Sequence, residues 1–128
     1  MIYLDTSAFL KLVKPEPETA AFEAFVDGRS DFVASALLAI EARRGALRRA
    51  PRSLPRVDLL LRDVELVAMS PAIVESASRL PDPLLRSLDA IHLATAILLR
   101  SDLELFVTYD SRLADAAAAY GIPTAGPT

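Results

Sequence analysis

The sequence contains no cysteine and only one histidine, His92. The lack of cysteine excludes disulfides, thiolate nucleophiles and cysteine-based zinc sites. It is also typical of a reducing compartment, so we expect a cytoplasmic protein. A single histidine excludes any mechanism that needs two imidazoles. Lysine is scarce too, because only Lys11 and Lys14 are present. The side chains left for chemistry are carboxylates, hydroxyls and arginines.

Long apolar runs are also missing, although 52% of the 128 residues are hydrophobic and the mean hydropathy is +0.32. Every apolar run is far shorter than the roughly 20 residues that span a bilayer. Only four residues precede the first acid, Asp5, and the N-terminal region has no basic segment followed by a long apolar stretch. We therefore expect no signal peptide and no membrane association. The length fits a single domain, residues 1–128, with one hydrophobic core.

Short apolar segments alternate with helical patterns along the chain. The predicted strands are residues 2–4, 32–34, 64–68, 106–108 and 122–124. The predicted helices are residues 8–13, 18–26, 36–50, 57–62, 71–80, 88–99 and 111–120. Ser35 and Ser87 are the predicted N-caps of the helices that follow them. Proline cannot donate to a strand ladder, so Pro123 places the last strand at an edge. This alternation predicts an α/β fold of three layers, with a mostly parallel sheet flanked by helices.

Four acids interrupt the apolar pattern. Asp5 and Asp110 each follow a predicted strand, and Asp89 is the only acid in the most apolar helix. Glu41 lies on a helix face that carries two leucines one turn earlier. Ligands of open parallel sheets bind beyond the carboxyl ends of the strands. We therefore expect the four acids to meet at that edge.

Each acid also has a purely local interpretation. Asp5 and Asp110 are suited to N-capping, and Asp89 in a first helical turn gains about 0.3–1 kcal/mol from the helix dipole. Glu41 could pair with Arg44 one turn later. These local roles do not explain why all four acids fall at one edge, and a shared pocket is the more economical interpretation.

A shared pocket of carboxylates requires a counter-charge. Two carboxylates about 4 Å apart repel by roughly 4 kcal/mol at an effective dielectric constant near 20. Either some pKa values rise, or a cation binds among them. Oxygen ligands without cysteine favour Mg²⁺ or Mn²⁺ over zinc, and such an ion promotes phosphodiester hydrolysis.

The distribution of charge along the sequence leaves open whether the protein binds a nucleic acid. The net charge is −3, but six of the fourteen basic residues lie within fourteen positions. They are Arg43, Arg44, Arg48, Arg49, Arg52 and Arg56. This strip is either a solvated helix face or a surface that contacts phosphates.

Four segments around these acids resemble the motifs of PIN-domain nucleases, and in particular of the VapC toxins of type II toxin–antitoxin systems. They are Leu4-Asp5-Thr6-Ser7, the helix around Glu41, Arg86-Ser87-Leu88-Asp89-Ala90-Ile91-His92-Leu93-Ala94, and Val107-Thr108-Tyr109-Asp110-Ser111-Arg112-Leu113. The resemblance covers essentially the whole chain, with the motifs in order.

The resemblance implies a PIN fold and an endoribonuclease that depends on Mg²⁺, with Mn²⁺ as a substitute. It also implies a homodimer and a VapB-type antitoxin as partner. By analogy, Asp5 and Asp89 are the metal ligands, and Glu41 and Asp110 complete the catalytic pocket.

The resemblance further suggests supporting residues. Thr6 or Ser7 would form a hydrogen bond with a carboxylate or with the scissile phosphate. His92 would contact either the RNA or a residue that is hydrogen-bonded to a metal ligand. The alternative for His92 is a core histidine with one satisfied nitrogen. Hydrolysis by metal-activated water would leave a 5′-phosphate and a 3′-hydroxyl, with no protein nucleophile.

Three other functions remain to be weighed. A phosphoacceptor receiver domain would have adjacent acids after the first strand and a late lysine, and the sequence has neither. A catalytically silent PIN domain that acts as a binding module would bind no Mg²⁺ and cleave no RNA. A structure-specific DNA nuclease would share the metal chemistry but not the substrate.

Overall fold

The computed structural model describes all 128 residues, Met1–Thr128. Its five strands are β1 (Ile2–Leu4), β2 (Phe32–Ser35), β3 (Val64–Val67), β4 (Leu105–Val107) and β5 (Thr124–Ala125). They form one sheet of order β3-β2-β1-β4-β5, and every neighbouring pair is parallel. This confirms the α/β class and the edge position predicted for the last strand.

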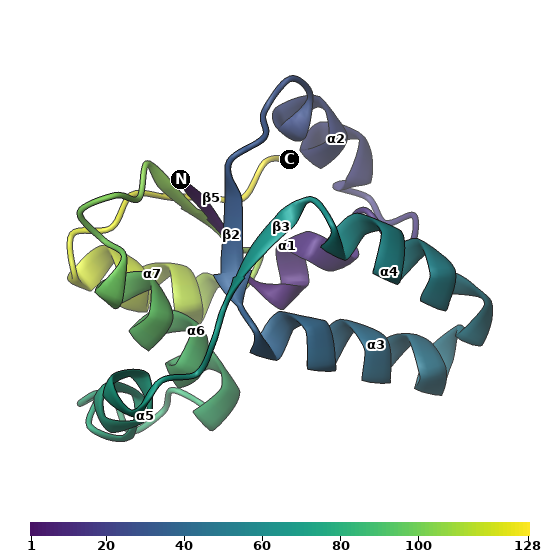
Figure 1. Ribbon diagram of the computed structural model, residues 1–128. Helices are drawn as coiled ribbons and strands as arrows, with labels where there is room; N and C mark the ends of the chain where they lie inside the picture. The colour runs from purple at the N-terminus through teal and green to yellow at the C-terminus, as the bar shows by residue number, and fades with distance from the viewer.

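Seven α-helices cover the sheet. They are α1 (Thr6–Leu10), α2 (Thr19–Val26), α3 (Leu37–Arg49), α4 (Leu54–Leu61), α5 (Pro71–Ser78), α6 (Ser87–Leu98) and α7 (Ser111–Ala119), with a short 3₁₀ turn, η1 (Pro51–Ser53), between α3 and α4. Figure 1 shows α1, α3 and α4 on one side of the sheet and α5, α6 and α7 on the other. The three layers predicted from the sequence are therefore present. No helix combines the length and the apolar character that crossing a bilayer would require.

The central strand β1 is buried on both faces because its side chains alternate between the two helical layers. Tyr3 packs with Phe106 and Leu93 beneath α6 and α7, and the Tyr3 and Phe106 rings stack 4.9 Å apart. Ile2 and Leu4 point the other way, into a cluster beneath α1 and α2. β1 thus holds its carboxyl end, where the first predicted acid lies, in the middle of the sheet.

Two predicted helix caps are wrong. Ser35 is the last residue of β2, where it pairs with Val67, and Ala36 is the N-cap of α3. The Ser35 hydroxyl still accepts the Leu37 N–H at 3.1 Å, so the residue type was informative although the boundary was not. Ser87 is the first residue of α6 and makes no capping bond. Helix boundaries read from residue type alone shift in this way by a residue or two.

Candidate active site

Parallel pairing of β1 with β4 places Asp5 beside the chain that follows β4. Leu4 pairs with Val107, and the Asp5 N–H donates to the Val107 carbonyl at 3.2 Å. Thr108 directly follows β4. Asp5 and Thr108 are both buried, with 3% and 4% of their surface exposed. Residues 103 positions apart in sequence thus meet at the carboxyl edge of the sheet, as predicted for a parallel α/β fold.

The Asp5 carboxylate is held by a full set of donors. Its Oδ1 accepts the Ala8 N–H at 2.9 Å and the Ser7 hydroxyl at 2.7 Å, and Oδ2 accepts the Thr108 hydroxyl. Asp5 is therefore the N-cap of α1, as its local interpretation predicted. Burial raises the pKa of Asp5 above its ordinary value, although the hydrogen bonds from Thr108, Ser7 and Ala8 oppose that rise.

Asp110 is both the N-cap of α7 and a neighbour of this network. Its Oδ1 accepts the Arg112 N–H at 2.9 Å and the Leu113 N–H at 3.4 Å. Its own N–H donates to the Thr108 hydroxyl at 3.0 Å, and Thr108 in turn donates to Asp5. Thr108 thus connects the two acids that follow β1 and β4.

The side chain of Asp89, in the first turn of α6, makes no hydrogen bond or ion pair, whereas the carboxylates of the other three acids each accept hydrogen bonds. It lines a cavity of about 300 Å³ together with Asp110. Burial raises the pKa of Asp89, and the negative charges of Asp110, Asp5 and Glu41 raise it further, while His92 opposes them. Asp89 therefore experiences the charge of all three other predicted acids, as expected if they share one pocket.

Glu41 is bonded to His92, and the predicted pair with Arg44 does not form. Its Oε1 accepts the Thr6 hydroxyl at 2.6 Å and lies 2.9 Å from His92 Nε2. His92 is 2% exposed, and its Nδ1 lies 2.8 Å from the Tyr3 hydroxyl. Burial acts to raise the pKa of Glu41, but the hydrogen bonds from His92 and Thr6 outweigh it, so the pKa lies below its usual value.

No lysine or arginine neutralises these acids. None of the four forms an ion pair with either residue type, and Glu41–His92 is the only pair that includes one of them. Lys11 is buried but bound elsewhere, at 2.9 Å to Glu18 and 3.2 Å to Glu16. The four acids therefore have no ion-pair partner among the lysines and arginines, although the exposed Arg86 and Arg112 line the cavity of Asp89 and Asp110.

The donor set fits a hard divalent cation, but the side chains do not yet form a coordination group. Both Asp89 oxygens, Glu41 Oε2 and Asp110 Oδ2 accept no hydrogen bond from the chain. Unpaired carboxylate oxygens of this kind are the ligands that Mg²⁺ and Mn²⁺ prefer. No three acidic or histidine side chains, however, converge closely enough to hold one ion together. Metal binding by Asp5 and Asp89 remains a prediction, and it requires side-chain rearrangement.

Two residues of the site were not predicted from the sequence. Thr108 donates to Asp5, and Tyr3 contacts His92 from the centre of the sheet. Thr108 precedes Asp110 by two residues at a strand end, which was an available signal. Tyr3 gave no such signal, because a buried strand aromatic is ordinarily a core residue.

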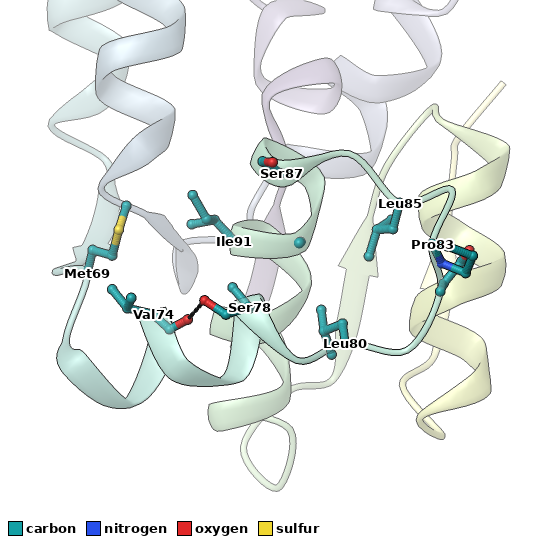
Figure 2. A pocket seen from close by; sticks show the side chains of 11 residues that line it. Met69, Val74, Ser78, Leu80, Pro83, Leu85, Ser87 and Ile91 are labelled. Carbon is teal, nitrogen blue, oxygen red and sulfur yellow. Dashed lines mark hydrogen bonds between the residues drawn. The ribbon is translucent and has the colours of Figure 1, made fainter.

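A second cavity, of about 400 Å³, lies between α5, α6 and the segment that joins them. Figure 2 shows Met69, Val74 and Ile91 around this hollow, with Leu85 on the joining segment. Leu85 also lines the cavity of Asp89 and Asp110, so the two hollows are neighbours. The lining is mainly apolar, with Asp82 as its only acid, and it offers contact surface and not catalytic groups.

Both the sequence and the fold are similar to those of known proteins. The model of the PIN domain matches residues 2–119. Ribonuclease VapC35 of Mycobacterium tuberculosis is 40% identical, over 99% of this chain and 97% of that protein. Ribonuclease VapC47 of the same organism is 36% identical, again over 99% of this chain and 97% of that protein. Among solved structures, a toxin–antitoxin complex from Klebsiella pneumoniae contains a similar chain, with a TM-score of 0.75, 24% identity and coverage of 100% of this chain and 98% of that one.

Proposed function

The chain belongs to the PIN-domain family, with VapC proteins as its relatives, and from this premise we propose that it is a Mg²⁺-dependent endoribonuclease, the toxin of a type II toxin–antitoxin pair. The observation that carries the proposal is the position of Asp89. Its carboxylate has no partner in the chain and faces the charge of three other acids. A bound divalent ion would stabilise the charged form of such a carboxylate more than that of an acid that already has partners.

Each of the four acids has its own role in the proposed reaction. Asp5 and Asp89 would hold the ion, and Mn²⁺ would be able to replace Mg²⁺. A bound divalent ion supplies Lewis acidity to a phosphodiester and to water. Glu41 on α3 is fixed through Oε1, so its Oε2 would be available to orient the attacking water. Asp110, the N-cap of α7, would present its Oδ2 in the same role. Water, and not a side chain, would attack phosphorus in line with the leaving 3′ oxygen, so the products would carry a 5′-phosphate and a 3′-hydroxyl.

The hydroxyls of Thr6 and Ser7 act on the carboxylates and not on the phosphate. Thr6 donates to Glu41 and Ser7 donates to Asp5, so each hydroxyl hydrogen is already used. The RNA backbone needs other partners. Arg86 and Arg112 line the cavity of Asp89 and Asp110 and are exposed, which places cationic groups beside the proposed reaction centre.

The partners follow from the same premise. We propose a VapB-type antitoxin, because VapC proteins are the relatives of this chain and a similar chain occurs in a toxin–antitoxin complex. We also propose a homodimer that works in the cytoplasm, where its RNA substrate is found. The hollow of Figure 2 offers a surface for the second copy, since Met69 and Val74 are 44% and 49% exposed.

A cleavage assay tests the proposal. Metal-stripped protein is incubated with a panel of defined RNAs and with DNAs of the same sequences, with and without MgCl₂. We expect RNA cleavage only with Mg²⁺ and none by Asp89→Asn, while Asp115→Asn, an exposed acid of α7, behaves like the parent. Equal cleavage in EDTA would refute the metal mechanism. Cleavage of DNA alone would favour the DNA nuclease.

A catalytically silent PIN domain is the second candidate. The observation in its favour is that no three acids or histidines converge into a coordination group. Under this alternative the protein binds its antitoxin but neither binds Mg²⁺ nor cleaves any RNA of the panel. Isothermal titration of the metal-stripped protein with MgCl₂ separates the two candidates, because only the enzyme should show saturable binding that Asp89→Asn abolishes.

A further inference from the structure

A chain of hydrogen bonds runs from the interior of the sheet to the acidic pocket. The Ser35 N–H of β2 donates to the Tyr3 hydroxyl of β1 at 3.1 Å. That hydroxyl lies 2.8 Å from His92 Nδ1 on α6, and His92 Nε2 lies 2.9 Å from Glu41 Oε1 on α3. Tyr3 is 0% and His92 2% exposed, so water does not compete for these bonds.

The donors and acceptors determine where the protons lie. An ionised Glu41 only accepts hydrogen bonds, and Thr6 already gives Oε1 its single hydroxyl hydrogen. His92 Nε2 must therefore carry a proton to bond Oε1. In a neutral imidazole Nδ1 is then an acceptor, and the Tyr3 hydroxyl, which accepts from Ser35, is free to donate to it.

We propose that Tyr3 and His92 are positioning residues that fix the orientation of the Glu41 carboxylate. Tyr3 holds His92 in the Nε2–H tautomer, and Nε2–H holds Glu41 Oε1, which leaves Oε2 available to the pocket. The step from orientation to catalysis rests on the proposed ribonuclease function. The tautomer and the hydrogen-bond chain do not.

Packing alone does not account for this arrangement. The Tyr3 and His92 rings meet edge to face, with centroids 5.9 Å apart, and a phenylalanine at position 3 would keep that contact. What it would lose is the hydroxyl, leaving a buried Ser35 N–H and His92 Nδ1 without partners, which costs about 1–3 kcal/mol per group. Buried polar chains are stable only when every member is satisfied, and each polar atom of this chain of bonds has a partner.

The single histidine makes the proposal directly measurable, because imidazole signals from ¹⁵N-histidine-labelled protein come from His92 alone. In the neutral imidazole we expect a protonated, pyrrole-type Nε2 and an unprotonated, pyridine-type Nδ1. Tyr3→Phe should mix or reverse the two tautomers, and Tyr109→Phe should not. Tyr109→Phe is a matched control because its hydroxyl donates to the Pro127 carbonyl at 2.7 Å, outside the chain of bonds. A parent protein with Nδ1–H, or with both nitrogens protonated, would overturn the proposal, as would a Tyr3→Phe spectrum identical to that of the parent.

Kinetics supply the second readout. We expect kcat of Tyr3→Phe to fall about 10–100-fold, the usual cost of losing an outer partner of a metal site, with the KM for RNA unchanged. His92→Phe should lose more, and His92→Gln, whose amide can still donate to Glu41, should recover part of the activity. Melting curves ensure that each variant is assayed while folded.

The two failures are distinguishable. If the parent cleaves no RNA, the ribonuclease proposal falls but the tautomer result still decides the hydrogen-bond chain. If the parent cleaves RNA and Tyr3→Phe changes KM alone, or behaves like Tyr109→Phe, the positioning role is refuted.

Discussion

At the scale of single residues, capping and clustering are compatible roles of one carboxylate. Asp5 accepts the Ala8 N–H as the N-cap of α1 and still lies within the electrostatic range of Asp89. Asp110 does the same for α7. The strand ends bring these acids together, and the helix that follows each strand supplies the N–H groups. A local role therefore does not argue against a shared site.

The pH dependence of stability tests the charge state of Asp89. Because its pKa is raised in the fold, Asp89 contributes stability below its ordinary pKa of about 3.9, and that contribution is lost as the pH rises through the raised value. Metal-free Asp89→Asn should therefore gain stability relative to the parent between about pH 4 and neutrality. Thermal melts across this range measure the difference.

Asp115→Asn controls for the general loss of a negative charge. It removes an exposed acid from α7 that is not one of the four acids of the site. If Asp89→Asn showed the same profile as Asp115→Asn, or lost stability as the pH rose, the repulsion among the acids would be absent.

The sequence predicted the acids of the site but not their partners. Asp5, Glu41, Asp89 and Asp110 interrupt apolar patterns, and such interruptions are visible in one dimension. The bond from Thr108 to Asp5 spans 103 positions and depends on the register of two strands, which no local pattern encodes. Asp89 and Asp110 line one cavity, and the convergence of all four acids on one ion stays a prediction.

At the scale of elements, substitutions of Asp110, the N-cap of α7, can distinguish a capping role from a catalytic role. Asp110→Asn keeps an oxygen for the Arg112 and Leu113 N–H groups, whereas Asp110→Ala removes the cap. We expect Asp110→Ala to lose about 1 kcal/mol of unfolding free energy and Asp110→Asn only a small part of it. Both should lose RNA cleavage, because both lack the carboxylate.

Urea denaturation and the cleavage assay together measure the two effects. Ser70→Ala is a suitable control, since Ser70 caps α5 through the Ile73 N–H and lies away from the acids. It should lose stability like Asp110→Ala while still cleaving RNA. Full activity of Asp110→Asn would show that Asp110 is a cap and nothing more.

Elements were predicted better than their ends. The five strands and their parallel direction follow from apolar segments alternating with helical patterns, because parallel neighbours need a crossover between them, whereas the strand order was not predicted. The boundaries at Ser35 and Ser87 shifted because strand pairing and the preceding loop, and not residue type, decided them. The first helix ends at Leu10 and not at Val13, with turns in between.

At the scale of the whole molecule, the proposed homodimer can be tested at the hollow between α5 and α6. Val74, 49% exposed on the rim of an apolar cavity, would be covered in a dimer. Val74→Glu should therefore shift the protein from dimer to monomer in light scattering coupled to size-exclusion chromatography. Leu59→Glu, at an apolar residue of α4 that is 57% exposed, is the control and should remain dimeric. A monomeric parent would refute the homodimer.

The charge of the whole pocket is tested most directly by adding the ion it is proposed to bind. The measurement is the melting temperature of metal-stripped protein as MgCl₂ is raised at constant ionic strength. A ligand at 100 times its Kd stabilises a fold by about 2.7 kcal/mol, so the melting temperature should rise with Mg²⁺ in the parent and stay flat in Asp89→Asn. A parent that Mg²⁺ leaves unchanged, or an Asp89→Asn variant that rises equally, would contradict the account.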